Sequence, residues 1–119
     1  MALTFSHVQL YVDDLSRAMR FYQRVLGFMP EYVAEPDYAR LKSDAMQFSI
    51  ALHLAHDAGD VGKGAVAYLV SDQLDETIRE LREKKVEVGE PRREGNSPRF
   101  TSFKDSEGNY WGLQESSPH

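Results

Sequence analysis

The sequence predicts an α+β fold in which one unit, a strand followed by a helix and three further strands, occurs twice. Segments in which apolar and polar residues alternate, as in strands, are interrupted twice by apolar residues at helical spacing. Each helical segment directly follows an alternating one. The two junctions, at Val12 and Val70, are 58 residues apart and have related sequences, Val-Asp-Asp and Val-Ser-Asp. An internal repeat of strand, helix and three strands explains both the spacing and the likeness.

Composition limits the class of protein further. The 119 residues, 41% of them hydrophobic, are enough for one core without disulfides. The absence of cysteine excludes thiolate nucleophiles and cysteine-bound metals. A net charge of -5 argues against binding nucleic acid, which needs clustered basic residues. The N-terminal residues lack the features of a signal peptide, and no apolar stretch is long enough to span a membrane, so we expect a cytoplasmic protein.

The first half is predicted to begin with a strand over residues 5–12, where polar and apolar residues alternate. Its polar face consists of His7, Gln9 and Tyr11. A helix should follow, because Asp13 and Asp14 can accept hydrogen bonds from the first turn of a helix. Apolar residues recur at every third or fourth position from 15 to 26, and Gly27 then provides a C-terminal stop.

Three strands complete the predicted first half, at residues 30–34, 38–42 and 47–54. The last repeats the design of the first strand, with one apolar face and one polar or small face that consists of Ser49, Ala51 and His53. Residues 56–64 contain three glycines and three charges without periodicity, which indicates a linker. We therefore expect a single domain with halves at residues 1–55 and 65–119.

The second half repeats the pattern. Residues 65–70 alternate as a strand, Asp72 can cap a helix, and Lys84-Lys85 favours the C-terminal end of that helix. The buried stripe of the helix is predicted to be Leu74, Ile78 and Leu81. The three strand candidates that follow are residues 86–88, 99–103 and 110–114. A helix covers only one face of such a half, so two halves are needed to enclose a core or a cavity.

Two stretches resemble a known family. Residues 7–15, continued by residues 21–28, are similar to the opening of glyoxalase/bleomycin-resistance (vicinal oxygen chelate) proteins, and residues 103–113 resemble the closing hairpin of that superfamily. The resemblance spans essentially the whole chain and implies a glyoxalase-like fold of curved sheets with a cavity. Within the hairpin, Asp105 and Gly108 also have a local role, because a turn needs an acceptor and a residue that tolerates positive φ.

The resemblance also implies a divalent metal with ligands on the first, fourth, fifth and eighth strands, usually histidine and glutamate. His7 fits the first position, and His53 fits the second less closely. Ala65 and Gly112 occupy the other two positions and cannot bind a metal. We therefore expect no cofactor, although a metal remains an alternative, and Glu115 could act as a third ligand only if a strand bulge turned it inward.

The inward faces together define the expected ligand pocket. It consists of His7, Gln9, Tyr11, Ser49, His53, Ala65, Tyr110, Gly112 and Gln114. The small residues at positions 65 and 112 would vacate volume, and Tyr11, Tyr110 and Tyr38 would offer flat surfaces to an aromatic or heterocyclic guest. The acidity of the chain weakly favours a cationic guest. A loop with Arg92-Arg93 and Arg99 either is a solvated basic loop or recognises a carboxylate or phosphate.

Three functions agree with these observations. The first is a small-molecule-binding protein resembling the bleomycin-resistance branch, without catalytic residues that the sequence identifies. The second is a metal-dependent lyase, isomerase or dioxygenase of the same superfamily, for which His7 would be essential. The third is a regulatory or partner-binding domain. Stoichiometric metal would distinguish the second from the first. The resemblance further implies a homodimer.

Overall fold

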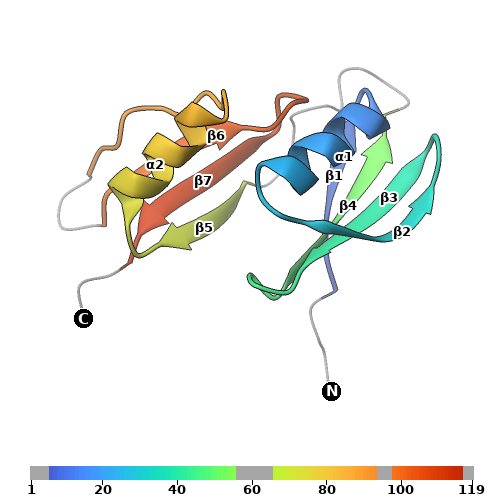
Figure 1. Cartoon of the computed structure of the whole chain (residues 1–119), viewed down its shortest axis with the longest axis horizontal. Coiled ribbons are helices and arrows are strands. Elements are labelled where there is room, and N and C mark those ends of the chain that lie inside the picture. Colours follow the sequence, from blue (N-terminus) through green and yellow to red (C-terminus); the bar gives the residue numbers. More distant parts are fainter. Residues whose placement is uncertain (1–5, 56–65, 94–97, 117–119) are drawn as a thin grey trace. The chain divides into compact units, whose positions relative to one another are not determined.

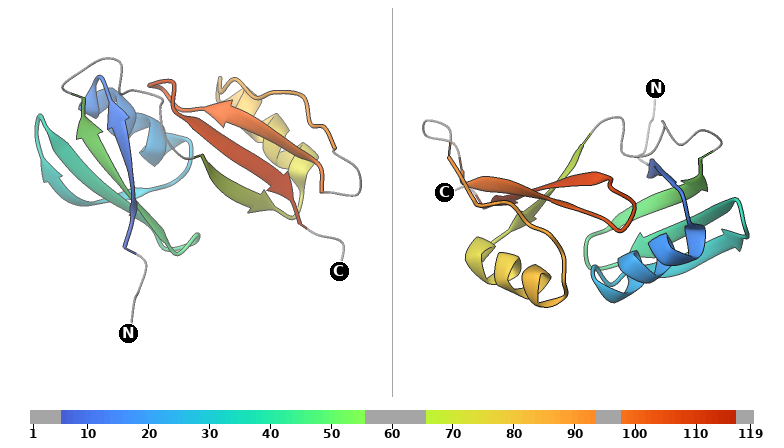
Figure 2. Two further views of the ribbon diagram at one scale, coloured as in Figure 1. Left: turned by 180° about the vertical axis from the view of Figure 1, so that it is seen from behind. Right: turned by 90° about the horizontal axis from the view of Figure 1, so that it is seen from above.

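The computed structural model describes residues 6–55, 66–93 and 98–116. The chain divides into two compact units, Met1–Lys63 and Gly64–His119. Each unit contains one mixed β-sheet with a helix lying across one of its faces (Figures 1 and 2). The chain thus has the α+β fold with two βαβββ modules that the sequence predicts.

The described residues of the first unit, 6–55, form four strands and one helix. In chain order they are β1 (Val8–Val12), α1 (Leu15–Arg24), β2 (Met29–Ala34), β3 (Tyr38–Ser43) and β4 (Phe48–Leu54). The spatial order of the strands is β1-β4-β3-β2, in which β1 pairs with β4 in parallel and the other pairs are antiparallel.

Helix α1 begins and ends as predicted. The carboxylate of Asp14 accepts a hydrogen bond of 3.0 Å from the backbone N–H of Arg17, and Gly27 takes a φ of +76° after the last turn. The helix packs against β3 and β4. Its buried residues are Leu15, Ala18, Phe21 and Tyr22.

Alternation along the strands gives this sheet two different faces. The face under α1 holds the core, in which Val12, Ala39, Leu41, Ile50 and Leu52 are fully buried. The opposite face, called here the first open face, carries the polar and aromatic residues of the same strands. Residues directly opposite each other on paired strands lie on the same face. The strand register therefore decides which side chains are neighbours on the first open face.

Within residues 66–93 and 98–116, the second unit has three strands and one helix. They are β5 (Ala67–Ser71), α2 (Leu74–Glu83), β6 (Phe100–Lys104) and β7 (Tyr110–Glu115), with the strands in the order β5-β7-β6. Leu74, Ile78 and Leu81 are buried, as the sequence predicts. The face of this sheet away from α2 is called the second open face. Among the described residues, no helix is long and apolar enough to cross a membrane.

Two local predictions for this unit are wrong. The strand expected at residues 86–88 is reduced to one isolated bridge between Val88 and Phe103, because the N–H of Val86 is bound to the carbonyl of Leu81 at the end of α2. Asp72 does not cap the helix. The N-cap residue is Gln73, which makes no side-chain cap hydrogen bond, and its own N–H donates to the hydroxyl of Ser71 over 3.0 Å.

The hairpin between β6 and β7 has the fold role predicted for it. Asp105 is only 6% exposed, and its Oδ1 accepts hydrogen bonds of 2.8 Å from the backbone N–H groups of both Glu107 and Asn109. Its Oδ2 accepts a third, of 3.0 Å, from the side-chain amide of Asn109. Gly108 adopts a φ of +87°. Trp111 and Leu113 in β7 are buried in the core.

Candidate functional site

Aromatic rings gather on the first open face. The centroid of the His53 ring lies 5.7 Å from that of Tyr11 and 6.2 Å from that of Tyr38, and both pairs meet edge to face. The Tyr38 ring in turn lies 6.2 Å from that of Tyr32. We call these four residues the aromatic platform. They come from all four strands of the sheet.

The strand register explains why the rings meet. His53 in β4 lies directly opposite Tyr11 in the parallel strand β1 and directly opposite Tyr38 in the antiparallel strand β3. Three strands therefore contribute to one row of side chains across the sheet. Tyr32 extends the platform from β2 and is 60% exposed. A flat ligand can add further ring contacts to such a cluster, and contacts between aromatic rings are favourable.

Hydrogen bonds orient two members of the platform. The Nδ1 atom of His53 lies 2.9 Å from the carbonyl oxygen of Leu54, and because a carbonyl only accepts, Nδ1 carries the proton and Nε2 is the acceptor of the neutral ring. The hydroxyl oxygen of Tyr38 accepts hydrogen bonds from Arg40, of 3.3 Å from Nε and 3.1 Å from Nη2. The platform is thus bordered by a half-buried cation.

The other residues predicted for this face do not make a metal site. Gln9 and Ser49 lie on the first open face, and His7 precedes β1, with its Nδ1 atom 2.7 Å from the hydroxyl of Ser6. His7 is four residues before Tyr11, the direct partner of His53. Four residues of strand span roughly 13 Å. His7 and His53 therefore do not fit the shared metal site that the sequence suggested.

On the second open face, Gly112 does not leave an empty space. The ring of Tyr68 in β5 lies directly over it, so that a Cβ atom at position 112 would be 2.4 Å from ring carbons of Tyr68. The expectation that this position vacates volume is wrong, because the ring fills it. The strand register places Tyr110 and Gln114 on the same face as Gly112. Ala65 lies outside the described residues.

Two cations lie over aromatic rings of this unit. Lys104 Nζ is 5.1 Å from the centroid of Tyr110, and the guanidinium of Arg92 is 5.2 Å from that of Phe100. A pocket of about 290 Å³ lies beside the second pair. Its lining consists of Tyr68, Gly89, Glu90, Arg92, Phe100, Thr101 and Ser102. Sequence reasoning missed Tyr68, although its place between Ala67 and Leu69 in an alternating strand indicated the open face.

The carboxylate of Glu115 forms ion pairs with Arg93 and Arg99. Its Oε1 accepts hydrogen bonds from the backbone N–H of Arg99 (2.9 Å) and from Arg93 (3.1 Å), and its Oε2 accepts one of 3.1 Å from Arg99 Nε. Arg99 also forms two hydrogen bonds of 3.2 Å with Asp75. The register of β5 and β7 runs without a bulge to Glu115. The idea that Glu115 completes a metal site is therefore wrong, and Arg93 and Arg99 are already paired.

These contacts shift two pKa values in the directions expected for ion pairs. The backbone N–H of Arg99, followed by its guanidinium, lowers the pKa of Glu115. Hydrogen bonds to Asp75 and Glu115 raise the pKa of Arg99. Among the described residues, no group of three or more His, Asp or Glu side chains is placed to bind a metal ion. The described part of the chain thus does not fit the resident metal that the resemblance implies.

We expect Glu115→Gln to lower the free energy of unfolding at pH 7, with a difference from the wild type that disappears in acid. Because the pKa of Glu115 is lower in the folded state, its stabilising effect is complete above the unfolded value of about 4.3 and is lost as the pH falls through the folded value. Urea unfolding between pH 7 and pH 3 measures this. Glu87→Gln, at an exposed position, is the control, and a pH-independent difference would contradict the expectation.

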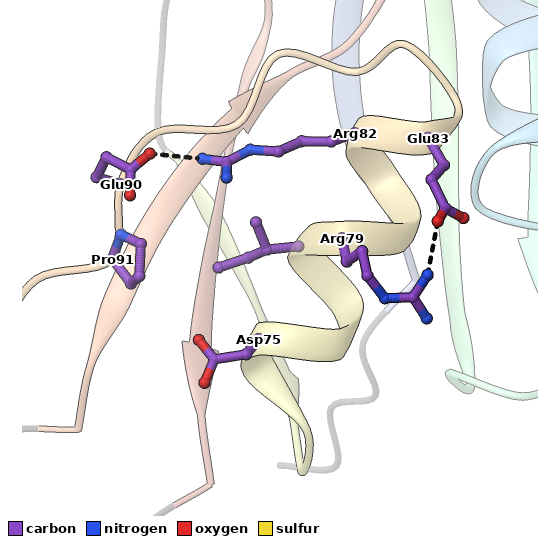
Figure 3. A pocket seen from close by; sticks show the side chains of 7 residues that line it. Asp75, Arg79, Arg82, Glu83, Glu90 and Pro91 are labelled. Carbon is purple, nitrogen blue, oxygen red and sulfur yellow. Dashed lines mark hydrogen bonds and ion pairs between the residues drawn. The ribbon is translucent and has the colours of Figure 1, made fainter.

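A second pocket, of about 440 Å³, lies along α2 (Figure 3). It is lined by Asp75, Ile78, Arg79, Arg82, Glu83, Glu90 and Pro91. Its arginines are already paired. Arg79 forms ion pairs with Glu76 and Glu83, and Arg82 bonds to Glu90 (3.1 Å) and to the carbonyl of Val88 (3.0 Å). The contacts of Arg82 hold the segment after α2 against the helix, and those of Arg79 lie within the helix. Both arginines thus have a structural role.

Comparisons with known proteins agree with this geometry. Residues 4–113 match the family model described as Glyoxalase/Bleomycin resistance protein/Dioxygenase superfamily. The search of curated proteins gave no significant match. Among solved structures, TnmS3, an antibiotic binding protein from Streptomyces sp. CB03234, is 24% identical with a TM-score of 0.76, over 98% of this chain and 100% of the other.

Two further structures are similar. A glyoxalase/bleomycin resistance protein/dioxygenase superfamily member from Sphaerobacter thermophilus DSM 20745 is 25% identical with a TM-score of 0.78, over 96% of this chain and 98% of the other. The fosfomycin resistance protein FosX from Listeria monocytogenes, described as complexed with Mn(II) and sulfate, is 18% identical with a TM-score of 0.78, over 99% of this chain and 94% of the other. The same fold thus occurs both in an antibiotic binding protein and in a protein with a metal.

Proposed function

Because this chain belongs to the Glyoxalase/Bleomycin resistance protein/Dioxygenase superfamily, we propose that it is a small-molecule-binding protein which holds a planar aromatic or heterocyclic guest without a metal ion. The observation that carries the proposal is the aromatic platform. Its rings are in mutual contact across four strands, so their positions are set by the sheet before a guest arrives. Flat guests gain most from such a surface.

The side chains of this chain favour binding over metal-dependent catalysis. Metal enzymes of this kind need about three protein ligands around the ion. Here the two candidate histidines are separated along the sheet, Glu115 is paired with arginines, and Tyr68 covers Gly112. The similar antibiotic binding protein supports the same assignment. The guest need not be an antibiotic, and the homodimer implied by the family resemblance is part of the proposal.

Binding of flat dyes and naphthalene derivatives, measured by calorimetry, tests this function. We expect Tyr11→Ala and His53→Ala each to weaken binding about 5- to 10-fold, since one ring contact contributes about 1 kcal/mol. Met46→Ala, in the turn between β3 and β4, is a matched control at an exposed apolar position and should leave affinity unchanged.

Elemental analysis of untagged protein separates the proposal from the enzyme alternative. The proposal predicts substoichiometric metal and undiminished guest binding after treatment with a chelator. One equivalent of divalent metal that is lost in His7→Ala would instead support a metal-dependent lyase, isomerase or dioxygenase. Equal affinity of the wild type and both platform variants would show that the guest binds elsewhere.

A further inference from the structure

Arg40 lies beside the platform, in the row of side chains that follows the row of Tyr11, His53 and Tyr38. In β3 it lies directly opposite Tyr32 of β2 and directly opposite Ala51 of β4. The methyl group of Ala51 is the only side chain that β4 places beside it in this row, so no bulky neighbour from that strand covers the guanidinium. Arg40 is half-buried. The guanidinium of Arg40 therefore lies where it can contact the edge of a guest that rests on the platform.

The charge of Arg40 has no acidic partner within the described part of the chain. Its hydrogen bonds both go to the neutral hydroxyl of Tyr38, and no carboxylate among the described residues is within 4.0 Å of its nitrogen atoms. The more exposed Arg79, Arg82 and Arg93 each have a carboxylate partner. A partly buried cation without a counter-ion favours an anion from outside, because the low local dielectric strengthens their attraction.

The hydrogen bonds to Tyr38 use one edge of the guanidinium and leave another edge that can bind a carboxylate. A guanidinium has five N–H donors in a fixed plane, and Tyr38 takes the Nε–H and one Nη2–H. Three donors remain, one on Nη2 and both on Nη1. One N–H of each Nη atom points in the same direction, and this pair matches the two oxygens of a carboxylate. The two hydrogen bonds to Tyr38 also fix the orientation of the guanidinium.

From this geometry we infer that the guest is a planar aromatic acid, whose ring lies on the platform and whose carboxylate binds Arg40. The inference rests on the proposed function and adds the chemical class of the guest. It replaces the expectation of a cationic guest drawn from the net charge of -5. Charges spread over the surface are screened beyond about 10 Å, whereas Arg40 would touch the guest directly.

Three naphthalene probes of matched shape test the inference by calorimetry at pH 7: 2-naphthoate, 2-naphthamide and 2-naphthylmethylammonium. We expect wild-type protein to bind naphthoate at least tenfold more tightly than the amide and the ammonium compound least tightly. Arg40→Gln should weaken naphthoate binding at least tenfold and change amide binding less than twofold. Arg40→Lys should recover part of the loss, because it keeps the charge but not the planar fork.

The outcomes separate the two proposals. Equal affinity for naphthoate and naphthamide, or an unchanged preference in Arg40→Gln, would overturn the inference while leaving the proposed function intact. Preference for the ammonium probe would also overturn it. Failure to bind any of the three probes would count against the proposed function itself and remove the basis of the inference. Arg79→Gln on α2, which removes another charge, controls for net charge, and thermal unfolding by circular dichroism verifies that each variant is folded.

Discussion

Gly112→Ala will lower the free energy of unfolding by about 1–3 kcal/mol, although alanine normally suits a strand better than glycine. The reason is the ring of Tyr68, which would lie 2.4–2.5 Å from the new Cβ atom. Real carbon contacts are about 3.5–4.0 Å. The ring must therefore turn away from the sheet, and it loses the packing that leaves it only 54% exposed.

The sign of this effect should reverse when Tyr68 is removed first. In a Tyr68→Ala background the clash disappears, and because Gly112 does not have a positive φ, alanine fits its backbone. Gly112→Ala should then stabilise by about 0.5–1 kcal/mol. Urea unfolding of the four proteins of this cycle measures the coupling between the two positions. A similar effect of Gly112→Ala in both backgrounds would show that the ring does not rest on Gly112.

The contact between Tyr68 and Gly112 also affects whether position 112 could hold a metal ligand. The family resemblance places a metal-binding carboxylate at position 112, where this chain has glycine. The side chain of such a residue would begin inside the ring of Tyr68. Replacing Gly112 by glutamate alone therefore cannot restore a ligand, because the aromatic ring on β5 would also have to move. The ring of Tyr68 thus excludes a ligand at position 112.

Local patterns in the sequence were sufficient to predict the first unit. Its helix is defined by Asp14 and Gly27, which act through hydrogen bonds and backbone angles within a few residues. Strand alternation gave the two faces of the sheet, and it identified Tyr11 and His53 as open-face residues. The same alternation places Arg40 two residues after Tyr38 on the same face, so this signal was present in the sequence.

Two of the wrong predictions concern the ends of α2, and the third depended on distant contacts. Residues 86–88 alternate like a strand, but the N–H of Val86 is used to end α2. Asp72 resembles a helix cap, but the N-cap position falls one residue later, at Gln73, which makes no side-chain cap hydrogen bond. Glu115 could not be assigned from the sequence, because its partners Arg93 and Arg99 are brought to it by the pairing of β6 with β7. Strand register, which decides the contacts of Glu115, is set by the tertiary fold.

The largest loss of stability from a single polar residue is expected for Asp105→Ala, at about 3 kcal/mol. The substitution removes the acceptor of two buried backbone N–H groups, those of Glu107 and Asn109, and of the Asn109 amide. Leaving a buried donor unsatisfied costs about 1–3 kcal/mol each, so the sum outweighs the effect of any exposed ion pair in the chain. Urea unfolding measures this loss.

Two further variants show which property of Asp105 matters. Asp105→Asn keeps one oxygen acceptor for the two backbone N–H groups but turns an amide towards Asn109, so we expect a loss of about 1–2 kcal/mol. Asp44→Ala removes a carboxylate that is 87% exposed and 4.0 Å from Lys42, and it should cost less than about 0.5 kcal/mol. If Asp105→Ala were no more harmful than Asp44→Ala, the turn would be held by the positive φ of Gly108 and the flanking strands, and the carboxylate would be dispensable.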